Sequence, residues 1–259
     1  MVENVTLARA GHIATVVIDN PGKLNAITLT GWGALGLMIR DLSRDPEIRC
    51  VVLQGAGEEA FSAGADIAEF PELRADAAQA RDYGAVVAAT LENLSACPHP
   101  MVAAIRGVCA GGGLEIASTC DIRIAGRSAR LGAPINRLGH AFAYPELEPV
   151  IAAFGRALAV ELTLEGRVLD AEEALRRGMV SRVVADGDLD AEVTATAARI
   201  AAGAPLVNRA AKKFARRLAE PEPLTEAELM ESYDLCDSED YAEGLRAFLA
   251  KEKPAFKGR

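Results

Sequence analysis

The sequence contains few of the residues from which metal and redox sites are made. It has three histidines, His12, His99 and His140, which lie far apart in the chain, and no Cys-x-x-Cys pair. Metal sites need several such ligands at short spacing, so we expect no metal site. Positive charge is also scarce. The net charge of −9 disfavours nucleic acid or an anionic membrane as a partner.

Long apolar runs and paired cysteines are absent as well. No segment approaches the length of a membrane-spanning helix, and the first residues lack the basic stretch and apolar run of a secretory signal. The cysteines are odd in number, and most lie in apolar segments. They are Cys50, Cys97, Cys109, Cys120 and Cys236. Such cysteines are typical of reduced core thiols, so we expect a cytoplasmic protein.

Strand-like apolar segments alternate with helical segments along most of the chain. The clearest strand-like segments are residues 13–18, 50–53, 101–105 and 122–125. Half of the residues are hydrophobic, which is enough for a large core. The last fifty or so residues have no strand pattern. We therefore expect an α/β core over residues 1–200 and a C-terminal helical region over residues 201–259.

The most informative segment joins a strand to a helix through three glycines. Met101 to Ile105 is a short apolar strand, Gly111 to Gly113 form the turn, and Leu114 to Cys120 has no helix breaker. A helix that begins at such a turn presents unpaired N–H groups to whatever lies above it, and Glu115 would lie in its first turn. The segment is either an ordinary tight turn with a dipole-favoured acidic residue or an anion hole beside a carboxylate.

A second segment, Phe61 to Ile67, repeats this pattern. Small residues lie between a strand and the start of a helix, and small side chains allow a ligand to lie directly on the backbone. The alternative is an ordinary strand–helix connection in which Asp66 caps the helix.

Six segments match a known family in order and at family spacing. They are Asn20 to Ala26, Phe61 to Ile67, Gly107 to Asp121, Gly132 to Pro134, Leu169 to Val180 and Asp237 to Phe256. Through them the chain resembles the crotonase (enoyl-CoA hydratase/isomerase) superfamily over nearly its full length. The resemblance implies an α/β fold, a spiral of ββα units, with a C-terminal helical trimerisation region. It also implies homotrimers or dimers of trimers that act on acyl-CoA thioesters, with coenzyme A as part of the substrate and no other cofactor.

The resemblance implies an oxyanion hole in which two backbone N–H groups bind the thioester oxygen. The matching groups are those of Ala65 and Gly112, and Glu115 matches a catalytic glutamate. Both amides lie where a loop meets a helix, which is where free donors are expected. Such a pair would stabilise an enolate. The substrate-binding residues implied in the same way are Lys23, Leu24, Ala26, Ala63, Gly64, Asp66, Ile67, Gly111, Pro134, Ile135 and Tyr144.

The chain departs from the family's hydratases at one catalytic position. Those enzymes hold and activate one water with two glutamates, and the second falls where this chain has Ile135. Isoleucine cannot transfer a proton, and general acid–base assistance is worth about 10²–10⁴-fold in rate. Glu115, whose pKa should be raised in so apolar a setting, would then act alone or with help from Tyr144, His140 or Glu146.

Three functions remain open at this point. The first, which we favour, is an enoyl-CoA hydratase- or isomerase-like lyase of fatty acid metabolism. The second is an acyl-CoA decarboxylase or thioester hydrolase that uses the same oxyanion hole, with Ile135 in an apolar pocket for the leaving carboxylate. The third is a non-catalytic acyl-CoA-binding protein that kept the fold.

Overall fold

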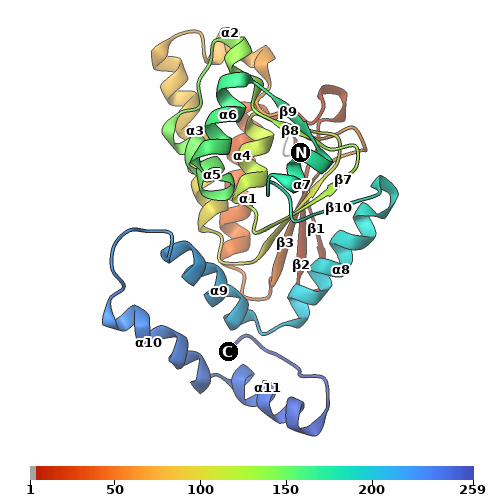
Figure 1. Ribbon diagram of the computed structural model, residues 1–259, viewed down its shortest axis with the longest axis vertical. Coiled ribbons are helices and arrows are strands. Elements are labelled where there is room, and N and C mark those ends of the chain that lie inside the picture. Colours follow the sequence, from red (N-terminus) through yellow and green to blue (C-terminus); the bar gives the residue numbers. More distant parts are fainter. Residues whose placement is uncertain (1–3) are drawn as a thin grey trace.

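The computed structural model describes residues 4–259, and its strands form two sheets (Figure 1). The larger sheet has the strand order β1-β2-β3-β5-β7-β10, and the smaller sheet has the order β4-β6-β8-β9. The strands are β1 Val5–Ala10, β2 Ile13–Ile18, β3 Cys50–Gly55, β4 Ala60–Ser62, β5 Met101–Ile105, β6 Val108–Ala110, β7 Ile122–Gly126, β8 Arg130–Gly132, β9 Val168–Asp170 and β10 Arg182–Val184.

From β3 to β8, strands of the two sheets alternate along the chain. β3, β5 and β7 pair in parallel in the larger sheet. β4, β6 and β8, each of which directly follows one of these strands, pair in parallel in the smaller sheet. A helical segment follows each strand pair. Each repeat is thus a ββα unit and successive units form a spiral, which confirms the predicted fold class.

Helices cover both faces of the larger sheet because side chains of its central strands are buried on both sides. In β3, Val51 and Leu53 belong to the main core, whereas Cys50 and Val52 pack against α8 on the opposite face. The α-helices are α1 Leu29–Ser43, α2 Phe70–Leu73, α3 Ala77–Ala96, α4 Gly112–Thr119, α5 Tyr144–Phe154, α6 Arg156–Glu165, α7 Ala171–Arg176, α8 Leu189–Ala202, α9 Pro205–Arg217, α10 Glu226–Asp234 and α11 Glu239–Ala250; the 3-10 turns are η1 Pro21–Lys23, η2 Ile67–Glu69, η3 Pro134–Leu138, η4 Asp186–Asp188 and η5 Leu235–Asp237.

Helices α1 and α3 cross closely and fix the position of Trp32. A Cβ atom at Gly36 would lie 2.8 Å from Oγ1 of Thr90, so only glycine allows this approach. The Thr90 hydroxyl donates a hydrogen bond to the carbonyl of Trp32 at 2.8 Å. Tyr83, on the same helix as Thr90, is 1% exposed. The crossing therefore holds two large aromatic side chains, Trp32 and Tyr83, in the core.

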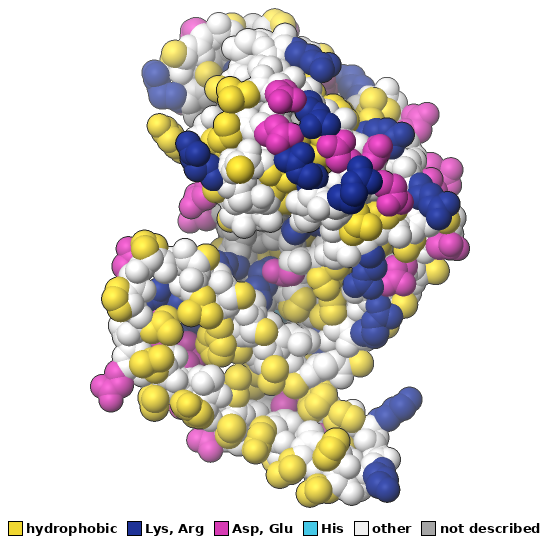
Figure 2. All heavy atoms as spheres, viewed as in Figure 1, with side chains coloured by type: hydrophobic (Ala, Val, Ile, Leu, Met, Phe, Trp, Pro, Cys, Tyr) yellow, Lys and Arg dark blue, Asp and Glu magenta, His cyan; other side chains and the backbone are white. Residues whose placement is uncertain are grey.

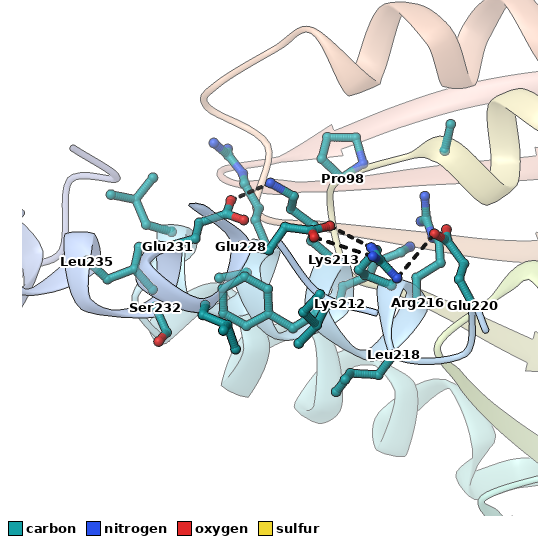
Figure 3. A pocket seen from close by; sticks show the side chains of 18 residues that line it. Pro98, Lys212, Lys213, Arg216, Leu218, Glu220, Glu228, Glu231, Ser232 and Leu235 are labelled. Carbon is teal, nitrogen blue, oxygen red and sulfur yellow. Dashed lines mark hydrogen bonds and ion pairs between the residues drawn. The ribbon is translucent and has the colours of Figure 1, made fainter. Parts of the chain in front are cut away.

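The last three helices form an arm that extends from the body of the molecule (Figure 1). Ion pairs join α9 to α10: Arg217 Nε lies 2.5 Å from Glu228 Oε1, and Lys213 pairs with Glu231 (Figure 3). Apolar side chains gather on the visible face of this arm (Figure 2), and Phe248 is 80% exposed. The predicted boundary between residues 1–200 and 201–259 falls inside the last turn of α8, two residues before that helix ends.

Of the smaller sheet, only the strand that leads into the small residues after Phe61 was expected from the sequence; β6, β8 and β9 were not predicted. The glycine turn was expected to follow the strand over residues 101–105 directly, and this was wrong because β6 lies between them. Three-residue strands are too short for a periodic pattern to reveal them. The antiparallel strand β1 was also missed; five of its six residues are exposed, so it lacks the apolar pattern of a core strand.

Candidate active site

Two bends of the backbone lie side by side because the strands before them are paired. β4 and β6 are parallel, with Ser62 opposite Cys109. The chain bends at Gly64 after β4 and at Gly111 after β6, where both glycines have positive φ angles. Since parallel strands end at the same edge of a sheet, the two bends meet there.

The contact between the bends requires glycine at Gly64, and the adjacent Trp32 ring requires glycine at Gly112. Gly64 has a φ of +95°, and a Cβ atom on it would lie 2.7 Å from the amide nitrogen of Gly112. A Cβ atom on Gly112 would lie 2.6 Å from Cζ2 of Trp32 and 3.3 Å from the Cα of Gly64. The backbone of one bend therefore packs directly on the backbone of the other, and the Trp32 ring closes the space beside them.

The amides of Ala65 and Gly112 have no acceptor within residues 4–259. Ile27 holds the first bend by donating to the Gly64 carbonyl at 2.7 Å and accepting from the Asp66 N–H at 2.9 Å, which leaves Ala65 between them unpaired. Gly112 is the first residue of α4, so its N–H has no acceptor inside the helix. Two unpaired donors thus flank the contact between the bends.

A cavity of about 130 Å³ lies beside these two amides. Its wall is formed by the two bends, by α1 and α3, by the loop after β8 and by the start of α5. The residues that line it are Trp32, Ala63, Ala65, Ile67, Phe70, Arg74, Tyr83, Val87, Ala110, Gly111, Gly112, Glu115, Pro134, Ile135, Leu138, His140, Phe142 and Glu146. Eight of the predicted site residues are among them.

Two buried carboxyl groups face this cavity. Glu115, in the first turn of α4, is 3% exposed, and Glu146, in the first turn of α5, is 4% exposed. Burial raises the pKa of Glu115 well above its ordinary value, and the neighbouring Glu146 raises it further. Burial also raises the pKa of Glu146, but the Ala143 N–H donates to its Oε2 at 2.7 Å and opposes that rise. Both carboxyl groups are therefore harder to ionise than an ordinary glutamate, and the Ala143 N–H favours the charged form of Glu146.

Glu146 is not at the sequence position where the resemblance to the family's hydratases places a second glutamate. Ile135, at the expected position, lines the cavity and is 9% exposed. Of the three residues considered as helpers, Glu146 and His140 line the cavity, whereas Tyr144 is 92% exposed and lies outside it. Tyr144 was named as a substrate-binding residue from the sequence, and this chain's cavity does not include it, because its side chain projects from the first residue of α5 toward solvent.

The remaining predicted residues lie on the segment next to the first bend. Lys23 and Asp66 form an ion pair at 2.7 Å, which lowers the pKa of Asp66. The Leu24 carbonyl accepts a hydrogen bond from the Ala63 N–H at 2.9 Å. The segment that begins at Lys23 and Leu24 continues through the buried Ala26. This segment borders the cavity without lining it. Ile67 connects the two regions, because it lines the cavity and is 49% exposed.

One charged group in the cavity wall was missed in the sequence. The Arg74 guanidinium lies 5.0 Å from the ring centroid of Phe70 and 5.4 Å from that of Tyr83. Its Nη2 donates to Nε2 of His140 at 3.0 Å. Burial and the neighbouring arginine lower the pKa of His140 to about 4, so this ring is neutral at pH 7. Arg74 lies in a charged segment between α2 and α3, where a sequence pattern cannot distinguish it from a solvated residue.

Within the described residues there is no cluster of three or more His, Cys, Asp or Glu side chains that could hold a metal ion. No helix of residues 4–259 is both long and apolar enough to cross a membrane.

Comparison with known proteins identifies the family. The sequence profile described as "Enoyl-CoA hydratase/isomerase" matches residues 8–259. The chain belongs to the enoyl-CoA hydratase/isomerase family. It is therefore an acyl-CoA-processing enzyme of enoyl-CoA hydratase/isomerase type, as the resemblance of its sequence segments predicted.

Individual family members are similar over nearly their whole lengths. The short-chain-enoyl-CoA hydratase of Clostridium acetobutylicum is 33% identical, and the alignment covers 99% of this chain and 98% of the relative. The (E)-benzylidenesuccinyl-CoA hydratase of Thauera aromatica is 34% identical over 98% of this chain and 99% of the relative. The crystal structure of an enoyl-CoA hydratase/carnithine racemase from Magnetospirillum magneticum has a TM-score of 0.97 and 49% identity, and covers 99% of this chain and 96% of that one.

Proposed function

We propose that this enzyme hydrates or isomerises short-chain enoyl-CoA thioesters with two glutamates, Glu115 and Glu146. In this proposal the N–H groups of Ala65 and Gly112 bind the thioester oxygen. The observation that supports it best is the occurrence of two buried carboxyl groups with raised pKa values in one cavity, beside two unpaired amides. Pairs of titratable groups whose surroundings separate their pKa values are typical of acid–base catalysis.

The environments of the two glutamates suggest their roles in hydration. Glu146, whose charged form is stabilised by the Ala143 N–H, would accept a proton from water as the water oxygen bonds to the β carbon. The electron pair of the double bond would move to the thioester oxygen, held by the two amides as an enolate. Glu115, whose pKa burial raises well above its ordinary value, would then protonate the α carbon. Losing one oxyanion donor typically costs about 10²–10³ in rate, so the amides and the acid–base pair contribute comparably.

The size of the cavity limits the acyl group. A volume of about 130 Å³ is close to that of a cavity of about 150 Å³ that binds benzene, so an acyl group of four or five carbons would fill it. The name of the Clostridium acetobutylicum relative, a short-chain-enoyl-CoA hydratase, agrees with this size. The coenzyme A part would lie outside, along Lys23, Leu24, Ala26, Asp66 and Ile67.

Two further proposals concern the whole molecule. Residues 201–259 would form the oligomerisation region of a homotrimer or a dimer of trimers, because the arm carries exposed apolar side chains on α10 and α11. The predicted cytoplasmic location agrees with its buried cysteines, all of which are free thiols.

The other two functions have less support. Decarboxylation would require an apolar pocket for the leaving carboxylate, and the cavity beside Ile135 contains two carboxyl groups as well. A protein that only bound acyl-CoA would gain nothing from two buried carboxyl groups, whose desolvation lowers stability.

The test is a comparison of Glu115→Gln, Glu146→Gln and Glu148→Gln with crotonyl-CoA as substrate. Glu148 is exposed on the same helix as Glu146 and serves as the control. We expect the first two variants to lose about 10²–10⁴-fold in hydration rate and the control to keep its activity. Full activity of Glu146→Gln would exclude the two-glutamate mechanism. Release of free CoA or CO₂ without hydration or isomerisation would support hydrolysis or decarboxylation instead.

A further inference from the structure

Arg74 brings a positive charge into the cavity wall without a carboxylate partner. None of the ion pairs found within residues 4–259 includes it, and the only hydrogen-bond partner of its guanidinium there is the neutral ring of His140. The residue is half-buried and lies over the rings of Phe70 and Tyr83. Arginine presents five N–H donors in a planar fork, and the interaction with His140 uses only one end of it. Most of this donor capacity is therefore available to a ligand.

Two more donors in the same wall have no acceptor. The hydroxyl of Tyr83 and the indole N–H of Trp32 are buried and without a hydrogen-bond partner in the described part of the chain. Each side chain is 1% exposed and lines the cavity. A buried polar group left unpaired costs about 1–3 kcal/mol. Because neither of these two atoms has accessible surface, the free donors that an acyl group with acceptor oxygens could reach are those of Arg74.

The dimensions of the cavity place Arg74 within reach of the acyl group. Arg74 and Glu115 line the same space of about 130 Å³, which also borders the amides of Ala65 and Gly112. Arg74 and His140 also line a more open hollow on their other side. An acyl group whose carbonyl lies at the two amides would therefore share this small space with Arg74, which stands at the cavity's boundary.

We propose that Arg74 binds a second carboxylate on the acyl group, so that the substrate is the CoA thioester of a short unsaturated dicarboxylic acid. This rests on the proposed hydration or isomerisation at Glu115 and Glu146. The planar fork of arginine matches the two oxygens of a carboxylate, and the rings of Phe70 and Tyr83 hold the guanidinium in the cavity wall. The alternative is that Arg74 only offsets the charge of the two glutamates. In that case Arg74 would affect the reaction of every acyl group to the same extent.

The test uses two substrates that differ only at the far end. Glutaconyl-CoA has a carboxylate where trans-2-pentenoyl-CoA has a methyl group. The rates of hydration are measured for the wild type, Arg74→Met, Arg74→Lys and, as a control, Arg81→Met, which changes an exposed arginine on α3. We expect the wild type to prefer glutaconyl-CoA. Arg74→Met should lose about 10–100-fold in kcat/KM with glutaconyl-CoA and remain within about threefold with pentenoyl-CoA. Arg74→Lys should recover part of the loss, and the control should match the wild type.

Binding without turnover provides a second measurement. Glutaryl-CoA and valeryl-CoA are saturated and unreactive, so their inhibition constants report recognition alone. We expect Arg74→Met to raise the inhibition constant of glutaryl-CoA but not that of valeryl-CoA. An equal effect of Arg74→Met on both members of each pair would overturn the proposal. Hydration of pentenoyl-CoA but not glutaconyl-CoA by the wild type would overturn it while leaving the proposed function intact. If Glu115→Gln and Glu146→Gln both kept the activity of the wild type, the proposed function would instead be refuted.

Discussion

Gly64→Ala is the most direct test of the proposed oxyanion hole. The substitution places a methyl group 2.7 Å from the amide nitrogen of Gly112, a distance that Cβ atoms essentially never adopt. Because the contacting atom belongs to the backbone, it cannot move aside as the end of a side chain could. The methyl group would therefore separate the bends and displace the amides of Ala65 and Gly112 relative to one another.

Gly64→Ala should have two effects, one on stability and one on rate. Alanine at a φ of +95° costs about 1–2 kcal/mol of backbone strain, which lowers stability. Displacing an oxyanion donor costs about 10²–10³-fold in rate, mainly in kcat, because the donors act most strongly on the enolate. The strain alone can be reproduced at Gly11, which has a φ of +56° and no heavy atom within 4 Å of a Cβ. Gly11→Ala is therefore the matched control.

The assay combines steady-state hydration of crotonyl-CoA with thermal unfolding of both variants. We expect both to lower the Tm, and only Gly64→Ala to lower kcat by two or more orders of magnitude. If Gly64→Ala unfolded at a reduced Tm but kept the kcat of the wild type, the two amides would not be the oxyanion donors, and the proposed chemistry would have to use another part of the cavity.

Three further predictions concern stability, reactivity and the end of the chain. Because the pKa of Glu115 is raised in the folded state, its ionisation opposes folding; Glu115→Gln should leave the Tm unchanged near pH 4 and raise it increasingly above the ordinary glutamate pKa of 4.5, and a constant difference from pH 4 to 8 would contradict this. Of the five thiols only Cys236 is exposed, and burial raises the pKa of Cys50 to about 12, so a thiol reagent should modify one cysteine in the native enzyme and five after unfolding. The buried Asp240 accepts hydrogen bonds from the N–H groups of Lys257 and Gly258 at 2.6 and 2.9 Å; Asp240→Ala should speed deuterium exchange there by about tenfold or more, and unchanged exchange would show that the end of the chain is held by other contacts.

The sequence predicted those parts of the site that depend on backbone conformation. The glycines around Gly64 and Gly112 indicated where small residues and unpaired amides would meet, and the position of Glu115 after the turn placed it in the first turn of a helix. These features are local, so a short segment is enough to reveal them. The central strands of the larger sheet were also predictable, because each is apolar over several consecutive residues.

Features that depend on contacts between distant segments could not be predicted in the same way. Arg74 and His140 are 66 residues apart and meet only because α2 and the loop after η3 border one cavity. Glu146 was one of three candidates, and only the orientation of α5 separates it from the exposed Tyr144, two residues earlier. A difference of two positions turns a helical side chain by more than a right angle, so the sequence alone could not decide which one faces inward.

The proposed use of main-chain donors at the two bends has a consequence for how such an enzyme can change during evolution. Carbonyl recognition that relies on the peptide backbone survives almost any replacement of the surrounding side chains, provided that the glycines remain. The proton-transferring groups can then move to other positions independently. The presence of isoleucine at Ile135 and of a carboxyl group at Glu146 suggests such a move. New reactions become accessible by moving a single acid from one side of the cavity to another, without rebuilding the framework that holds the thioester.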